Sequence, residues 1–127
     1  MRATLFTLCA MNFDLDGHIM HAPITGANGV VNSETIFRFC QEGDVVRASY
    51  AGGKVRFGEL IGRLEGDALE FRYCQIDTEG RLDGGVSKCS IETRADGALR
   101  IIVRFHREAC GTRGINIIED APEGWQE

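Results

Sequence analysis

Residues 34–77 read ETIFRFCQEGDVVRASYAGGKVRFGELIGRLEGDALEFRYCQID, and this stretch decides the fold. Short runs in which apolar and polar residues alternate are separated by glycine-containing turns at Glu42-Gly43-Asp44, Gly52-Gly53 and Glu65-Gly66-Asp67. Alternation with a period of two is typical of strands with one buried face, and glycine between such runs is typical of hairpin turns. The stretch therefore predicts four consecutive antiparallel strands, at 35–41, 45–50, 54–64 and 68–77.

The same pattern continues toward the C-terminus. Turns at Thr78-Glu79-Gly80, Ala95-Asp96-Gly97 and Cys110-Gly111 separate further strands that we expect at 82–93, 98–109 and 114–119. Upstream, residues 17–22 and the Val30-Val31 region supply one or two more. No window shows a convincing apolar period of 3.6 residues, which a helix would need. The predicted fold class is therefore all-β, with eight or nine short strands.

Consecutive antiparallel strands leave two exposed edges unless the sheet closes on itself. We therefore expect an antiparallel up-and-down β-barrel of about eight strands, and a barrel of this size can hold one small ligand in its interior. The alternation predicts inward-pointing side chains on two of the strands: Leu69, Phe71, Tyr73 and Gln75, and Leu99, Ile101, Val103 and Phe105. It predicts that their neighbours point to solvent: Glu70, Arg72, Arg100 and Arg104.

The composition fits a single globular domain over residues 1–127, with residues 1–15 as an extension or extra strand and 120–127 as a polar tail. Hydrophobic residues make up 43% of the chain and charged residues 26%, which is ordinary for a folded soluble protein. The net charge is −5 and there is no basic run. Such a chain gains little from phosphate backbones or an anionic membrane surface, so we expect neither nucleic acid nor membrane as a partner.

The cysteines favour a reducing compartment. There are five of them without CxxC spacing, at Cys9, Cys40, Cys74, Cys89 and Cys110. Three of these could meet on adjacent strands as a soft-metal cluster, but isolated cysteines in strands are more often small buried hydrophobes. Residues 3–10 form an apolar segment that is too short for a secretory signal. We therefore expect reduced, buried thiols in a cytoplasmic protein, with no metal site.

Several turns and barrel spacings together resemble a known family. They are Glu34-Thr35-x-Phe37-x-Phe39-x-Gln41-Glu42-Gly43-Asp44, Tyr50-x-Gly52-Gly53, Gly58-x-Leu60-x-Gly62, Phe71-Arg72-Tyr73 and Gly84-Gly85. Over residues 16–119 the chain resembles small bacterial avidin-like proteins, many of which carry an automatic label of N-acetylglutamate synthase. The resemblance implies a calycin-type β-barrel. It does not imply biotin binding, because avidins line their pocket with tryptophans and the single tryptophan here, Trp125, lies in the polar tail.

The synthase label can be tested against the residues. Acetyl-CoA acyltransferases of the common type cradle pyrophosphate on a glycine-rich turn that opens a helix. The nearest match here, Arg81-Leu82-Asp83-Gly84-Gly85-Val86, lies between two expected strands with no helix after it. We therefore do not expect this activity.

Two histidine groupings have structural explanations. His18 and His21 are three residues apart, which places them on opposite faces of a strand rather than around one metal ion. His106 and Cys110 are four residues apart, about 13 Å along an extended strand and so too far for a base and its nucleophile. The sequence predicts no cofactor.

Polar residues on the inward phase are more informative. A closed apolar core has little use for hydroxyls and amides, because each needs a partner once it is buried. Apolar walls with a few convergent polar groups are typical of a small-molecule pocket. We expect the ligand-binding residues to be Thr35, Phe37, Phe39, Gln41, Phe71, Tyr73, Gln75 and Ser87. The alternative is that Gln41, Tyr73 and Gln75 lie near the rim and bond to loop backbone.

The leading functional hypothesis is therefore binding of a small, partly apolar molecule inside the barrel. The alternative is a cofactor-independent enzyme, of isomerase or cyclase type, that uses the same cavity. A third class is an interaction protein that works through its outer surface.

One strand breaks the alternation and predicts self-association. In residues 54–64 one phase carries Val55, Phe57 and Ile61 while the other carries Leu60 and Leu64, so both faces are apolar. An apolar outer face implies a cover. We expect a homodimer through this face, extended by Ile102 of the strand at 98–109 if the two strands are near each other. The alternative cover is the segment 22–32 or the first ten residues.

Overall fold

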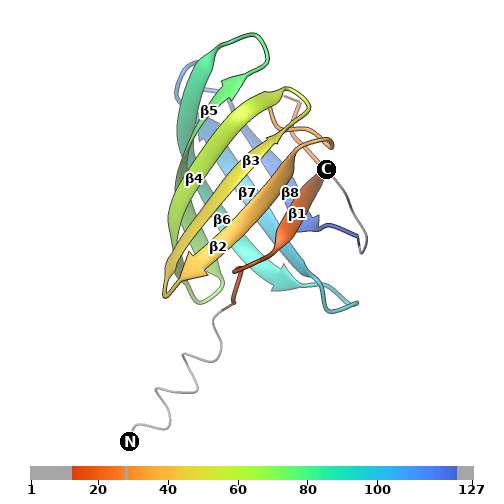
Figure 1. Ribbon diagram of the computed structural model, residues 1–127. Coiled ribbons are helices and arrows are strands. Elements are labelled where there is room, and N and C mark those ends of the chain that lie inside the picture. The colour runs from red at the N-terminus through yellow and green to blue at the C-terminus, as the bar shows by residue number, and fades with distance from the viewer. Residues whose placement is uncertain (1–12, 28, 123–127) are drawn as a thin grey trace, which may run out of the picture.

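The computed structural model describes residues 13–27 and 29–122. Eight strands form one closed antiparallel barrel in chain order, with β1 paired to β8 (Figure 1). They are β1 (Ile19–Ile24), β2 (Ile36–Glu42), β3 (Val45–Gly52), β4 (Val55–Glu65), β5 (Ala68–Asp77), β6 (Leu82–Thr93), β7 (Leu99–Arg107) and β8 (Arg113–Asp120). No helix occurs among the described residues. The predicted all-β up-and-down barrel is confirmed.

The predicted glycine turns connect the strands. Gly43, Gly66 and Gly97 have φ values of 62°, 62° and 89°, a region that residues other than glycine rarely adopt. The strands expected between residues 35 and 119 all form, with small shifts at their ends. The Val30-Val31 region is not a strand, so β1 is the one strand before β2 and the total is the lower of the two expected numbers, eight. Val30 and Val31 instead lie in the β1–β2 connection and pack against the core. This packing accounts for the apolar pattern at these two positions.

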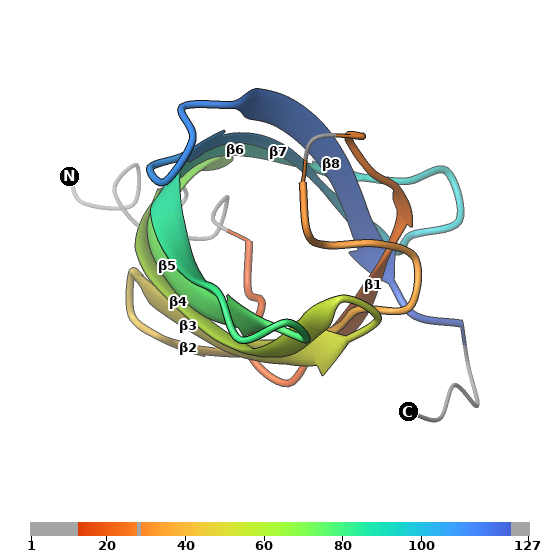
Figure 2. The same cartoon turned by 90° about the horizontal axis from the view of Figure 1, so that it is seen from above.

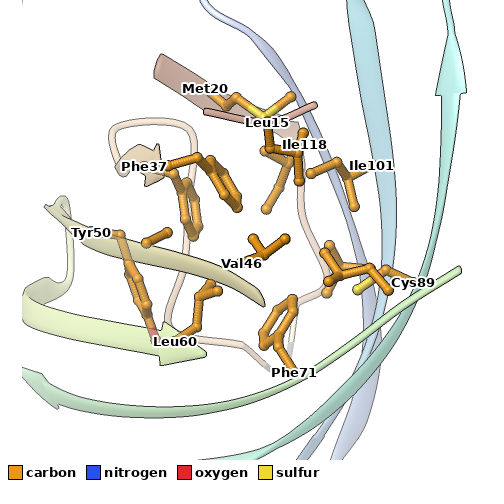
Figure 3. Packing of buried hydrophobic residues seen from close by; sticks show 14 of the residues in the cluster. Leu15, Met20, Phe37, Val46, Tyr50, Leu60, Phe71, Cys89, Ile101 and Ile118 are labelled. Atoms are coloured by element: carbon orange, nitrogen blue, oxygen red, sulfur yellow. The ribbon is translucent and has the colours of Figure 1, made fainter. Parts of the chain in front are cut away.

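One end of the barrel is filled by apolar side chains. The hairpins β2–β3, β4–β5 and β6–β7 lie at this end, which we call the closed end (Figure 1). Large side chains that are fully buried pack here or near it: Leu15, Met20, Val46, Leu69 and Ile101. Figure 3 labels four of them, Leu15, Met20, Val46 and Ile101. Their burial supplies much of the hydrophobic stabilisation of the barrel.

The opposite end, which we call the mouth, is partly covered by the connection between β1 and β2. Figure 2 shows this connection, in orange, crossing part of the opening. Gly26 N–H donates to Asn116 Oδ1 of β8 at 3.0 Å, and the Thr35 hydroxyl donates to the Gly52 carbonyl of β3 at 3.0 Å. These bonds fix the connection at both of its ends, so that Val30 and Val31 sit against the interior.

The outer surface corrects two expectations about the β4 face. Phe57 and Ile61 are 53% and 57% exposed, so the segment 22–32 does not cover them; the first ten residues lie outside the described part of the chain. Ile102 does not extend this face, because β7 is separated from β4 by two intervening strands. Ile102 instead pairs with Ile117 of β8.

The cysteines differ from the expected buried thiols. Of the four that the structure describes, Cys89 is buried, Cys40 is half-buried, and Cys74 and Cys110 are exposed. Cys74 is exposed because it alternates with Tyr73 and Gln75, which take the inward phase of β5. Cys9, Trp125 and most of the expected extension and tail lie outside the described residues. The described residues include no helix long and apolar enough to cross a membrane.

Candidate functional site

A cavity of about 40 Å³ occupies the mouth half of the lumen. Every strand except β1 contributes to it, together with the β1–β2 connection. Its lining is Gly29, Val30, Val31, Phe37, Tyr50, Leu60, Phe71, Tyr73, Gln75, Ser87, Val103, Phe105, Arg107, Asn116 and Ile118. One water molecule needs about 10–15 Å³ of such space, so the cavity has room for about three. A larger guest requires movement of the lining.

Aromatic rings form much of the wall. The rings of Phe37 and Tyr50 stack with their centroids 4.8 Å apart, and Tyr73 meets Phe71 edge to face at 6.3 Å. Phe105 of β7 adds a third aromatic region. It pairs with Gly114 of β8, and a Cβ on Gly114 would overlap the Phe105 ring. Aromatic faces of this kind favour flat or apolar guests.

Two tyrosine hydroxyls supply neutral polar groups. Tyr50 donates to Gln75 Oε1 at 2.8 Å, in a fully buried hydrogen bond. Tyr73 makes a long contact of 3.4 Å with the His106 carbonyl. Burial raises the pKa of both phenols far above the usual value. Both tyrosines therefore stay protonated and uncharged near neutral pH.

An ion pair lies at the mouth. Arg107 Nε donates to Asp83 Oδ2 at 2.6 Å, and Asp83 Oδ1 also accepts N–H bonds from Gly84 and Ala109 at 2.8 and 3.1 Å. Burial by itself raises the pKa of Asp83, but the hydrogen bond from Arg107 and the two backbone bonds outweigh it and hold the pKa below its usual range. The carboxylate is therefore ionised and neutralises the guanidinium.

Ser87 differs from every other polar residue of the lining. It is 1% exposed, and its Oγ is the one buried side-chain nitrogen or oxygen in the described residues without a hydrogen-bond partner. Its register partners are Phe71 on β5 and Phe105 on β7. The hydroxyl is thus set between two aromatic side chains on the wall of the cavity.

The structure brings five of the eight predicted site residues together. Phe37, Phe71, Tyr73, Gln75 and Ser87 line the cavity. The expectation that the other three would join them is not met. These three residues lie at other depths along the barrel axis than the cavity. The period of two predicts which face of a strand a residue takes, but not its depth along the barrel.

Those three residues have structural partners. Gln41 lies at the closed end, where its Oε1 accepts the Leu15 N–H at 2.9 Å and its Nε2 donates to the Gly43 carbonyl at 2.9 Å. Thr35 is buried and accepts the Asn32 N–H at 3.1 Å while it donates to Gly52. Phe39 packs one step deeper in the core, with its ring centroid 6.3 Å from that of Phe37.

Three polar lining residues were not predicted. Tyr50 shares the inward phase of Val46 and Ala48, so the alternation in β3 could have identified it. Arg107 likewise follows Val103 and Phe105 on the inward phase of β7, but a charge at a strand end is usually solvated. Asn116 lies between isoleucines, a pattern that gives no signal of its own.

The other groupings take structural partners. His18 Nδ1 is 2.6 Å from Asp120 Oδ1, and Cys110 Sγ is 3.2 Å from Thr112 Oγ1. Gly84 and Gly85, from the stretch compared above with the glycine-rich turn of acetyl-CoA acyltransferases, lie within β6. A Cβ on Gly85 would overlap the His106 carbonyl of β7, so the glycine allows the two strands to come close together. In residues 13–27 and 29–122, no group of three or more His, Cys, Asp or Glu side chains is placed to hold a metal ion.

Comparison with known families agrees with this architecture. The family model described as avidin-like protein matches residues 13–121. The chain belongs to the avidin-like family. The resemblance seen over residues 16–119 is thus confirmed, and the closed barrel of this avidin-like protein fits it. Searches of curated proteins and of solved structures gave no match.

Proposed function

We propose that this avidin-like protein binds a small, partly apolar molecule in the mouth half of its barrel. The observation that carries the proposal is the composition of the cavity wall, in which aromatic rings surround a few polar groups that point inward. This arrangement is typical of sites for small molecules. The family is consistent with this proposal, since its fold is a barrel that can hold a ligand.

Entry of a ligand requires the β1–β2 connection to give way. A cavity of about 40 Å³ admits only water-sized groups, and Val30 and Val31 close it on the mouth side. Displacing two half-buried valines frees space for a ring-sized molecule, and the ligand's own apolar surface replaces their contacts. The Gly26 bond to Asn116 is the tether that such a movement would break or lengthen.

Native mass spectrometry tests the proposal. The protein is incubated with a metabolite mixture, and the mass of any bound compound is measured for the wild type and for two matched variants. Phe37→Trp fills the lumen and should weaken binding, at a cost of about 1–3 kcal/mol of stability from overpacking. Ile115→Trp enlarges an exposed side chain on the outer wall of β8, away from the lumen and from β4, and should bind like the wild type. A compound retained equally by all three proteins would place binding outside the lumen and contradict the proposal.

The enzyme alternative uses the same cavity and is separated by one further measurement. The compound identified by mass spectrometry is incubated with the protein, and its conversion is followed over time. Stable binding without conversion supports a binding protein. Conversion that is abolished in Phe37→Trp supports an isomerase or cyclase.

We also propose that the protein forms a homodimer through the outer face of β4. Phe57 pairs in register with Ile76 of β5, which pairs with Leu82 of β6, and all three are exposed. We call this row the apolar row. Exposed Arg56 and Glu59 lie beside it, so a twofold axis can bring opposite charges together around it.

A cytoplasmic location remains part of the proposal. It is supported by the four described cysteines, none of which takes part in a disulfide. Unpaired, partly exposed thiols persist in reducing compartments.

A further inference from the structure

The unpartnered hydroxyl of Ser87 points to the chemistry of the ligand. Buried hydroxyls are nearly always paired, because an unpaired one loses its hydrogen bonds to water and gains none in return. Ser87 lines the cavity, and its Oγ has no hydrogen-bond partner in the described part of the chain. Alanine would fill this position between Phe71 and Phe105 without the unpaired oxygen. The occupant of the cavity, water in the free protein and the ligand when it binds, is the partner that the geometry leaves for it.

The walls around Ser87 define where the rest of the ligand lies. Phe71 and Phe105 flank the hydroxyl on the neighbouring strands. β2 lies across the lumen from β6 (Figure 2), and it carries Phe37, whose ring stacks on Tyr50. A molecule with a polar group at Ser87 therefore extends toward the Phe37–Tyr50 pair, whose aromatic faces favour a flat apolar body.

The charges of the site favour an uncharged ligand. Arg107 is the one charged residue in the described lining, and Asp83 already neutralises it at 2.6 Å. The Asp83 side chain is 6% exposed and holds two backbone N–H bonds besides. A buried ionic group needs a counter-charge, and Asp83 already supplies the counter-charge of Arg107.

The size of the site favours a compact ligand. The cavity is about 40 Å³, whereas an apolar protein cavity that binds benzene is about 150 Å³. A single ring thus already requires Val30 and Val31 to move, and a second ring would have to displace wall residues on the strands as well.

We propose that the lumen selects an uncharged single-ring molecule with one hydroxyl, carbonyl or amide group, and that this group hydrogen-bonds with Ser87 Oγ. The inference rests on the proposed function, since it names the ligand class of the same cavity. It assigns Ser87 as the residue that recognises the polar group. The stacked Phe37–Tyr50 pair and Phe71 bind the ring.

Three small probes of similar size test this inference. Phenol carries a neutral hydroxyl, toluene replaces it by a methyl group, and benzoate carries a charge. Affinities are measured by ligand-observed NMR for the wild type, Ser87→Ala and Ser90→Ala; Ser90 lies on the outer face of the same strand, opposite Ala68. The wild type and Ser90→Ala should prefer phenol to toluene by about three- to tenfold, the effect of one hydrogen bond. Ser87→Ala should lose the preference for phenol and favour toluene, because the phenol hydroxyl is then buried without a partner. Benzoate should bind most weakly.

Each other outcome has a definite meaning. A preference for phenol that survives in Ser87→Ala, or a preference for benzoate, overturns the inference while lumen binding stands. If none of the three probes binds, but a metabolite binds to the wild type and not to Phe37→Trp, the proposed ligand class is overturned and lumen binding stands. Probe binding that is unchanged in Phe37→Trp contradicts the proposed function itself. Thermal unfolding provides a folding control, because Ser87→Ala removes an unpaired hydroxyl and should leave Tm unchanged or higher.

Discussion

The hydroxyl of Tyr50 on β3 donates a hydrogen bond of 2.8 Å to Gln75 Oε1 on β5, across the intervening strand β4. Gly58 of β4 stands in register between the two residues, paired with Tyr50 on one side and with Gln75 on the other. A Cβ at residue 58 would overlap the Tyr50 ring. The glycine therefore allows the phenol to cross β4, and a buried amide and a buried hydroxyl satisfy each other.

Gly58→Ala should destabilise the protein by about 1–3 kcal/mol, because the added methyl group displaces the Tyr50 ring from a packed core. Chemical denaturation measures the change. The matched control is a double-mutant cycle with Tyr50→Val, which removes the ring. In that background Gly58→Ala should cost little, whereas an equal cost in both backgrounds would mean that the glycine matters for another reason.

The alternation of apolar and polar residues was enough to predict the barrel and much of its lining. It placed Phe37, Phe71, Tyr73 and Ser87 inside because each follows the period of two within its strand. Closure followed from the need to remove sheet edges. These inferences depend only on local geometry, which the sequence states directly.

The depth of a residue along the barrel axis could not be predicted in the same way. Gln41 has the correct phase but lies at the closed end, where it binds Leu15 and Gly43. Val30 and Val31 were interpreted as a strand because two adjacent apolar residues are typical of a strand. The same residues are equally suited to a connection that is buried at the mouth. Arg107 was overlooked because a charge at a strand end is usually solvated, and because its partner Asp83 is 24 residues away in the chain. Each of these depends on the stagger of the strands, which only the closed barrel fixes.

The Asp83–Arg107 pair should make stability depend on pH. The pKa of Asp83 is lower in the folded protein than its usual value, so its contribution is complete at neutral pH and is lost as the pH falls through that lowered pKa. Asp83→Asn should cost about 3 kcal/mol at pH 7, because it removes the buried carboxylate that pairs with Arg107. The difference from the wild type should shrink below about pH 4.

Asp44→Asn is the control for this prediction. Asp44 pairs with Arg63 at 3.5 Å on the surface, with both side chains more than half exposed, and such pairs contribute about 0–1 kcal/mol. Urea unfolding curves at several pH values compare the three proteins. An equal and pH-independent loss in both variants would show that the Asp83 pair contributes no more than a surface pair.

The thiols should differ in reactivity. Hydrogen bonding from Thr112 lowers the pKa of the exposed Cys110 thiol, whereas burial raises the pKa of Cys89 to about 12. Because the thiolate is the reactive form, iodoacetamide near neutral pH should modify Cys110 in the folded protein and leave Cys89 intact until unfolding. Peptide mass spectrometry measures both rates. Thr112→Val should slow alkylation of Cys110 and leave the exposed Cys74 unaffected; equal rates at Cys110 and Cys89 would contradict the prediction.

If the homodimer forms as proposed, one negative charge introduced in the apolar row should weaken it more than a charge introduced elsewhere on the surface. Phe57, Ile76 and Leu82 form this row across three adjacent strands, and Leu82 is 68% exposed. Phe57→Glu puts a carboxylate from each copy into the proposed twofold contact, where the charges lose water and repel each other. The wild type should show about twice the 14.0 kDa chain mass by size-exclusion chromatography with light scattering at micromolar concentration. Phe57→Glu should show the single-chain mass while keeping the β-type circular dichroism spectrum.

Ile115→Glu separates an effect of this face from a general effect of added charge. Ile115 is 49% exposed on β8, which lies on the opposite side of the barrel from β4, so the same substitution there removes a similar exposed side chain far from the apolar row. It should remain dimeric. A wild-type mass near 14 kDa would end the dimer proposal, and a dimer split by Ile115→Glu but not by Phe57→Glu would move the interface to the β7–β8 side, where Ile102 pairs with Ile117. Because both variants add one negative charge to an exposed strand position, a difference between two variants that keep the β-type circular dichroism spectrum reports where the two copies meet.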